Sequence, residues 1–132
     1  MGTRYLIDTC AVIKFLQVSF PEKGLLLLDS ILDNECQISF ITQIELLAWK
    51  NQQESSLLVY KQFIKGSKIL YINEIIINQA IEIRKKTNVK LPDAIIAATA
   101  LCYNFTLISD NDKDFTKITD FGLNYLNSNT IS

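Results

Sequence analysis

Short β-prone runs alternate with helical patterns along almost the whole chain, with no linker, repeat or low-complexity stretch between them. The predicted strands are residues 4–8, 37–41, 68–72, 105–109 and 124–126. The predicted helices are residues 9–16, 22–33, 42–49, 54–64, 73–86, 92–103 and 113–118. Strands that alternate with helices form parallel sheets that are covered on both faces. The sequence therefore predicts an α/β fold, a parallel-sheet α/β/α sandwich, as a single domain over residues 1–132.

Acidic residues stand where the surrounding sequence is apolar. Asp8 ends the first predicted strand, Glu45 lies inside an apolar helix, Asp93 opens another, and a polar group at 110–114 follows the fourth strand. A buried carboxylate is strongly disfavoured unless a cation or hydrogen bonds compensate its charge. Ligands of open α/β sheets bind at the carboxyl ends of the strands, where we expect these residues to meet. The arrangement predicts carboxylates gathered around a divalent metal.

Each acid also has a purely structural interpretation. Asp8 is a favoured N-cap for the helix that follows it. Asp93, directly after Pro92, would complement the dipole of a first helical turn. Glu45 is harder to explain in this way, because its helix is apolar almost all round and leaves little solvated face. A partner for the Glu45 charge is therefore expected.

Several other kinds of site are excluded. The chain has no histidine, which removes the serine-protease arrangement and most transition-metal sites, and its three widely spaced cysteines are expected to be reduced thiols. The stretch 110–114 has the alternating oxygens of a calcium loop, but Phe115 and Phe121 replace the glycine and glutamate which that loop requires. No apolar run approaches the roughly 20 residues of a membrane span, and no signal peptide is visible, so a cytoplasmic protein is expected.

Positive charge gathers locally, although the formal net charge of the chain is −1. A balance so close to neutral argues against a protein whose whole surface binds nucleic acid. Four cations cluster just before Asp93, namely Arg84, Lys85, Lys86 and Lys90, and Lys113 and Lys117 flank the last acidic group at helical spacing. These runs are either a local binding patch or the solvated ends of helices.

Four short motifs follow one another on this alternating chain. They are Tyr5-Leu6-Ile7-Asp8-Thr9, Ser39-Phe40-Ile41-Thr42-Gln43-Ile44-Glu45-Leu46, Leu91-Pro92-Asp93-Ala94-Ile95-Ile96-Ala97-Ala98-Thr99-Ala100, and Leu107-Ile108-Ser109 leading to Asp114-Phe115. With these motifs the chain resembles PIN-domain ribonucleases, above all the VapC toxins of bacterial toxin-antitoxin pairs, over nearly its whole length. The resemblance implies a PIN-like fold and a divalent-metal-dependent endoribonuclease.

The resemblance also implies a catalytic site that uses Mg²⁺ or Mn²⁺. Asp8, Glu45 and Asp93 match the acids that hold metal in such nucleases. At the fourth position Asn111 matches the family's Asn or Asp, and the flanking carboxylates of Asp110 and Asp112 are able to take its place as metal ligands. Hard carboxylate oxygens suit these ions, which activate water for in-line attack on a phosphodiester without help from a histidine.

One residue departs from the family pattern. The first motif is commonly Asp-Thr-Asn, and here Cys10 follows Asp8 and Thr9. The exchange removes a polar side chain but no metal-binding carboxylate. If that side chain orients Asp8 or contacts substrate, weaker metal binding or slower turnover is expected.

The partners implied by the resemblance are an RNA substrate (tRNA or rRNA), a cognate antitoxin whose tail covers the active-site groove, and a second copy of the chain in a homodimer. Because the acids repel phosphates, nearby polar and cationic side chains are expected to hold the RNA. The candidate substrate-binding residues are Thr9, Thr42, Lys14, Lys50, Lys113 and Lys117. In the helix 54–64, the side chains of Leu57, Leu58, Tyr60 and Phe63 either contact a partner or pack into the protein's own core.

Two functions from other classes are the alternatives. The first is a catalytically weak or inactive binding module of PIN-like fold, which keeps the acids but acts through protein contacts. The second is a phosphoacceptor receiver domain, which also combines an α/β fold with an acidic metal site. The receiver is disfavoured because Asp8 stands without a second acid at the first strand, and because the strand 68–72 is followed by Asn73 rather than an aspartate.

Overall fold

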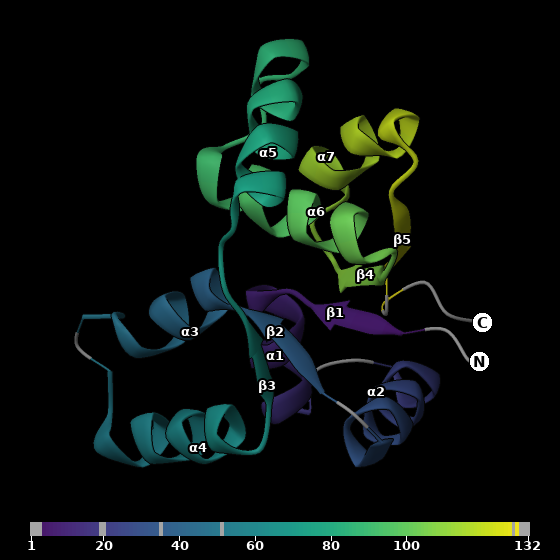
Figure 1. Ribbon diagram of the computed structural model, residues 1–132. Helices are drawn as coiled ribbons and strands as arrows, with labels where there is room; N and C mark the ends of the chain where they lie inside the picture. Colours follow the sequence, from purple (N-terminus) through teal and green to yellow (C-terminus); the bar gives the residue numbers. More distant parts are fainter. Residues whose placement is uncertain (1–3, 19–20, 35, 51, 128, 130–132) are drawn as a thin grey trace.

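A five-stranded sheet forms the centre of the protein. The computed structural model describes residues 4–18, 21–34, 36–50, 52–127 and 129. Within this part of the chain the strand order is β3-β2-β1-β4-β5, and every neighbouring pair is parallel (Figure 1). The strands are β1 (Tyr5–Ile7), β2 (Gln37–Ser39), β3 (Lys68–Leu70), β4 (Thr106–Ser109) and β5 (Asn124–Asn127). The predicted parallel α/β architecture is confirmed, and the first strand of the sequence is the central one.

Helices connect the strands and cover both faces of the sheet (Figure 1). They are α1 (Thr9–Leu16), α2 (Glu22–Asn34), α3 (Phe40–Leu47), α4 (Glu54–Lys65), α5 (Glu74–Lys86), α6 (Leu91–Tyr103), α7 (Asp112–Phe115) and the 3₁₀ helix η1 (Thr116–Phe121). Leu6 and Leu107 pack with α5, α6 and α7, whereas Ile7 and Ile108 pack with α1, α2, α3 and α4. Successive strand residues point to opposite faces, so the apolar runs of β1 and β4 fill both halves of the core.

The start of α3 differs most clearly from the predicted boundaries. Residues 37–41 were predicted as one strand, but β2 ends at Ser39, whose hydroxyl accepts a hydrogen bond from the Ile41 backbone N–H at 3.1 Å. A serine N-cap of this kind satisfies one of the free N–H groups of the first turn. The helix therefore begins at Phe40 rather than at residue 42, and Glu45 is reached less than two turns from the sheet edge.

Helix α6 brings an acid to the same edge. Its alanines Ala94, Ala97, Ala98 and Ala100 are fully buried. Pro92 stands in the first turn, where its missing N–H would have no helical partner in any case. Asp93 consequently lies at the open end of a helix whose body is in the core. Although α6 is largely buried, neither it nor any other helix that the structure describes is long and apolar enough to cross a membrane.

The predicted helix 113–118 is two shorter elements, α7 and η1. The buried side chains of Phe115 and Ile118 attach them to the same half of the core as α5 and α6. The 3₁₀ helix ends at Gly122, which has a φ of 94°. Glycine adopts this left-handed conformation without steric penalty, and the turn leads the chain into β5.

Candidate active site

The carboxyl ends of two central strands and two helices meet at one edge of the sheet. Asp8 directly follows β1, Ser109 ends the neighbouring β4, Glu45 lies on α3, and Asp93 lies in the first turn of α6. A cleft of about 490 Å³ opens at this edge. Its lining residues are Asp8, Thr9, Cys10, Ile13, Glu45, Asp93, Asp110 and Asn111. The cleft brings together acids from widely separated parts of the sequence.

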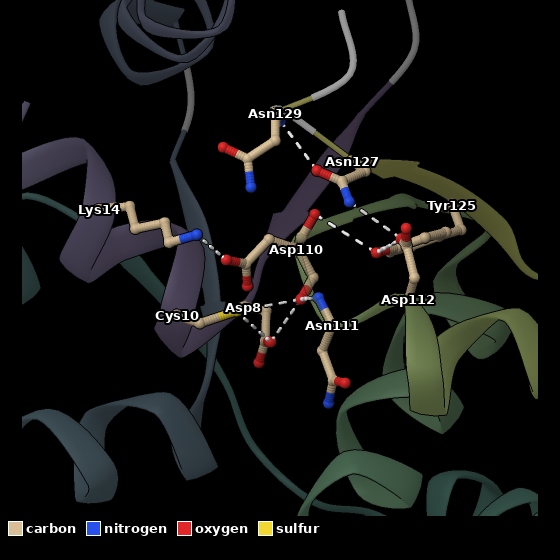
Figure 2. A network of polar contacts seen from close by, with 10 residues as sticks. Asp8, Cys10, Lys14, Asp110, Asn111, Asp112, Tyr125, Asn127 and Asn129 are labelled. Carbon is tan, nitrogen blue, oxygen red and sulfur yellow. Dashed lines mark hydrogen bonds and ion pairs between the residues drawn. The ribbon is translucent and has the colours of Figure 1, made fainter. Parts of the chain in front are cut away.

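Asp8 is buried at the base of this cleft, with 4% of its surface exposed. The Ser109 hydroxyl donates to Asp8 Oδ2 at 2.8 Å, and the Cys10 thiol donates to the same oxygen at 3.2 Å (Figure 2). Burial raises the pKa of Asp8, and the hydrogen bonds from Ser109 and Cys10 partly oppose that effect. Asp8 occupies the N-cap position of α1 but makes no side-chain capping bond there, so capping does not account for its carboxylate.

Replacing Ser109 by alanine is expected to weaken Mn²⁺ binding about tenfold or more. Partners that orient a metal ligand typically contribute about 10- to 100-fold in affinity, and Ser109 holds Asp8 at a fully buried position. Isothermal titration with Mn²⁺ measures the effect. Thr99→Val is the matched control, because it removes a buried hydroxyl that donates to Ile95 O at 2.8 Å within α6. Equal Mn²⁺ affinities in wild type and Ser109→Ala would contradict the prediction that Ser109 orients Asp8 for a metal ion.

The expectation that the helix around Glu45 leaves little solvated face is wrong. The Glu45 side chain is exposed, and the neighbouring Ile44 on α3 is 55% exposed. Thr9 Oγ1 donates to Glu45 Oε1 at 2.6 Å and lies 3.1 Å from Thr42 Oγ1. Thr9 and Thr42, which were predicted to contact substrate, thus link α1 to α3 and hold the Glu45 carboxylate at the mouth of the cleft.

Asn111 lies between two carboxylates. Its Nδ2 donates to Asp93 Oδ2 and to Asp114 Oδ2, each at 3.3 Å. Burial, followed by the neighbouring carboxylates, raises the pKa of Asp93 to about 7. Against the effect of slight burial, hydrogen bonds from Asp93 and Asn111 and the charges of Lys117 and Lys90 lower the pKa of Asp114. Together these pKa shifts favour a proton on Asp93 that is hydrogen-bonded to the Asp114 carboxylate.

The carboxylates of Asp110 and Asp112 have other partners (Figure 2). Asp110 forms an ion pair with Lys14, and its pKa is lowered by side-chain hydrogen bonds despite partial burial. Tyr125 Oη donates to Asp112 Oδ1 at 2.6 Å, and Asn127 Nδ2 donates to the same oxygen at 3.0 Å. These bonds lower the pKa of Asp112. Both carboxylates are therefore already paired with donors of the protein.

The four lysines predicted to hold substrate differ in their surroundings. Lys14 is paired with Asp110, as described above. Lys50 and Lys113 are exposed. Lys117 donates a hydrogen bond of 2.9 Å to an asparagine in the turn after α5, and its charge acts on the acid cluster. Lys14 is thus paired directly with an acid of the cleft, and the charge of Lys117 acts on Asp114.

The order of these elements and their acids can be compared with known families. The model of the PIN domain family matches residues 5–120. The chain belongs to the PIN-domain family. This confirms the family predicted from the four sequence motifs. No curated protein matches the sequence of this PIN domain significantly.

Solved structures of toxin-antitoxin complexes are similar to this PIN domain. VapBC-1 from nontypeable Haemophilus influenzae has a TM-score of 0.79 at 27% identity, over 96% of this chain and 98% of that one. A toxin-antitoxin complex from Klebsiella pneumoniae gives 0.76 at 24% identity, over 96% and 99%. VapBC2 from Rickettsia felis, bound to a DNA fragment from its promoter, gives 0.78 at 21% identity, over 95% and 98%. The fold of this PIN domain is thus shared along nearly its full length.

The side chains of the PIN-domain cleft suit a hard divalent cation in their chemistry. As placed, no group of three or more acidic or thiol side chains in the described part of the chain is close enough to enclose an ion. Glu45 is exposed, and an exposed glutamate changes rotamer at small cost. Burial is the largest cause of the raised pKa of Asp8 and of Asp93, and neighbouring carboxylates add to it. The residues present therefore fit a divalent cation that gathers them on binding.

Asp114 is the member of this PIN-domain cluster that sequence reasoning did not assign. The contacts of Asp110 and Asp112 favour Asp114 over both as the fourth carboxylate. A signal was present in the sequence, because Asn111 and Asp114 are three residues apart at the start of a helix. Residues at this spacing share a helix face, so both side chains can reach Asp93.

Proposed function

We propose that this PIN domain is a divalent-metal-dependent endoribonuclease, the toxin of a toxin-antitoxin pair that cleaves structured cellular RNA. The observation that carries the proposal is the convergence of Asp8, Glu45 and Asp93 on one cleft, with Asp114 joined to Asp93 through Asn111. Crowded carboxylates raise one another's pKa and are costly to keep ionised unless they serve a cation. A chain without histidine is suited to phosphodiester hydrolysis through such a cluster.

Four carboxylates would together bind Mg²⁺ or Mn²⁺. Asp8 and Asp93 would supply oxygens from the cleft, Asp114 would supply one from its place beside Asn111, and Glu45 would complete the set from its exposed side. Oxygen ligands and partial hydration are what both ions prefer. A divalent cation held there would supply positive charge to offset the charge of the phosphate and would help to ionise a water for the attack.

Neutral side chains keep these acids in position. Ser109 and Cys10 fix the rotation of the Asp8 carboxylate, Thr9 holds Glu45, and Asn111 spaces Asp93 from its neighbour. In the metal-free protein Asp93 retains a proton near neutral pH, because its pKa is about 7. That proton must leave before Asp93 can offer a cation its full negative charge.

Partner binding is the second part of the proposal. The relatives named above are toxin-antitoxin complexes, and two apolar surfaces of this chain are available for such contacts. Leu58 on α4 is 58% exposed, although Tyr60 of the same helix packs into the core. Ile77, Ile81 and Leu91 line an apolar groove between α5 and α6 and are 43%, 45% and 56% exposed. We propose that these two surfaces make the contacts with an antitoxin and with a second copy of the chain.

Cleavage of a mixed pool of tRNA and rRNA tests the proposal. Purified protein is expected to produce discrete fragments with Mn²⁺ and none with EDTA, and renewed addition of Mn²⁺ is expected to restore cutting. Fragment ends mapped by sequencing would then identify the RNA and the site. No cutting by a folded protein that binds Mn²⁺ would overturn the nuclease and favour the binding module that acts through protein contacts.

A further inference from the structure

A second, cationic cleft lies beside the acid cluster. It measures about 520 Å³ and forms where the end of α5 and the following turn meet η1. Its lining residues, called the Lys117 cleft below, are Lys85, Lys86, Thr87, Asn88 and Lys117. The lining contains three ammonium groups, an amide and a hydroxyl. Such a surface is suited to anions and offers no apolar wall.

The lysines of the Lys117 cleft are held in place without being neutralised. Lys117 Nζ donates to Asn88 Oδ1 at 2.9 Å, and the Lys86 ammonium lies 5.7 Å from the centroid of the Phe121 ring. Among the residues that the structure describes, neither ammonium group has a carboxylate within salt-bridge distance. Lys85 has only a long contact of 3.8 Å with the exposed Glu82. Positive charge in the cleft is therefore available to a ligand.

The Lys117 cleft is built from residues close to the acid cluster along the chain, since Lys117 stands three residues after Asp114 and Asn88 stands five residues before Asp93. Lys117 and Lys90 both act electrostatically on Asp114, which Asn111 joins to Asp93. Lys90 is the N-cap residue of α6, three positions before Asp93. Asp114 is therefore a member of the acid cluster that the charge of Lys117 reaches. A polyanion that enters the acid site from this side passes the lysines first.

A simpler explanation covers part of this charge. Cations at the end of a helix interact favourably with its dipole, and α5 ends with three basic residues. Arg84 has such a structural role, because its guanidinium donates to Val89 O at 2.6 Å. Lys90 and Lys117 belong to other segments, so the dipole of α5 does not account for them. Their gathering on one side of the acids calls for another reason.

We propose that the Lys117 cleft binds the phosphodiester backbone of an RNA strand next to the acid cluster. The inference rests on the proposed function, because acids that cut RNA repel its phosphates and need positive charge beside them. Polar side chains without an exposed stacking ring contact phosphates rather than bases, so this cleft positions RNA without selecting its sequence. The adjoining acid cluster favours RNA over an acidic peptide as the occupant.

Binding to uncleaved RNA tests the inference. Fluorescence anisotropy of a labelled 12-nucleotide RNA is measured with Asp8→Asn protein at several salt concentrations, with and without the added pair Lys86→Gln and Lys117→Gln. The pair is expected to weaken binding about tenfold and to reduce the slope of log K against log salt by about 1.4, because each phosphate contact to a single strand contributes about 0.7. Lys61→Gln with Lys65→Gln on α4 is the matched control, since both lysines are exposed and remote from the acids.

The outcomes separate this inference from the proposed function. Unchanged affinity and slope in the Lys86 and Lys117 pair, with the melting temperature within about 2 °C of the parent protein, would overturn it. Displacement of the RNA by an equally charged oligoglutamate, with the same loss in the variant, would assign the cleft to an acidic peptide instead. Cleavage by wild-type protein is assayed separately. RNA binding through the cleft without cutting supports the inference and counts against the nuclease.

Discussion

Asp8→Asn is expected to lower the rate of RNA cleavage at least about a hundredfold and, in the same protein, to raise the stability of the metal-free state. The loss exceeds the roughly 10- to 100-fold effect of partners that only orient a ligand, because a metal-binding carboxylate itself is removed. The gain in stability of the metal-free state follows from the burial of Asp8. Asp8 is 4% exposed and its pKa is raised, so folding of the metal-free chain works against its charge.

Two measurements on purified Asp8→Asn protein check this pair of opposite effects. Single-turnover cleavage with saturating Mn²⁺ reports the rate, and thermal unfolding in EDTA is expected to move upward by about 4 °C for each kcal/mol gained. Asp110→Asn is the matched control. The Asp110 carboxylate is paired with Lys14, so its loss is expected to change cleavage less than about tenfold. Equal losses of cleavage in the two variants would show that the site extends to Asp110.

Mn²⁺ is expected to stabilise the wild-type protein by about 10 °C at pH 8, and by clearly less at pH 5.5. A ligand at 100 times its Kd adds about 2.7 kcal/mol, which corresponds to a shift of this size for a chain of this length. The pH dependence comes from Asp93, whose pKa in the metal-free fold is about 7. Below that pH the cation must displace a proton, so metal binding weakens as pH falls.

The metal-free protein is expected to show the opposite trend. A carboxyl group with a folded pKa above its unfolded value binds protons more tightly in the folded state, so its stabilising effect is present at low pH. For Asp93 this effect is lost as pH rises from near its ordinary value of 3.8 to about 7. Asp93→Asn should flatten both profiles. A Mn²⁺ shift that is the same at pH 8 and pH 5.5, or absent at both, would contradict the role given to Asp93.

The architecture was readable from the sequence because each central strand is apolar on both faces and each connection is helical. Leu6 with Ile7, and Leu107 with Ile108, gave the pattern of a parallel sheet buried on both sides. The boundary between β2 and α3 at Ser39 could not be predicted in the same way. The residues after it favour strands by propensity, and the capping hydrogen bond of the serine decides for helix.

The acids of the site could be predicted from the sequence, but the residues that pair with them could not. Asp8 and Asp93 stand out from an apolar context, and their motifs resemble a family. Which carboxylate near residue 111 joins Asp93 depends on the fold. Lys14 of α1 pairs with Asp110 and Tyr125 of β5 donates to Asp112, whereas Asn111 links Asp114 to Asp93. Ser109 reaches Asp8 only because β4 pairs with β1 in a register that no local pattern encodes.

The central position of β1 also determines at which point of synthesis the cleft can form. Tyr5 pairs with Thr106, and Asp8 is bonded to Ser109, 101 residues further along the chain. Contacts across so much sequence form slowly, since the loop between them must be closed first. A nascent chain that has emerged as far as α5 carries Asp8 and Glu45 but lacks the strand that completes the cleft. The cleft of this PIN domain therefore cannot form until β4 has been synthesised and has joined the sheet.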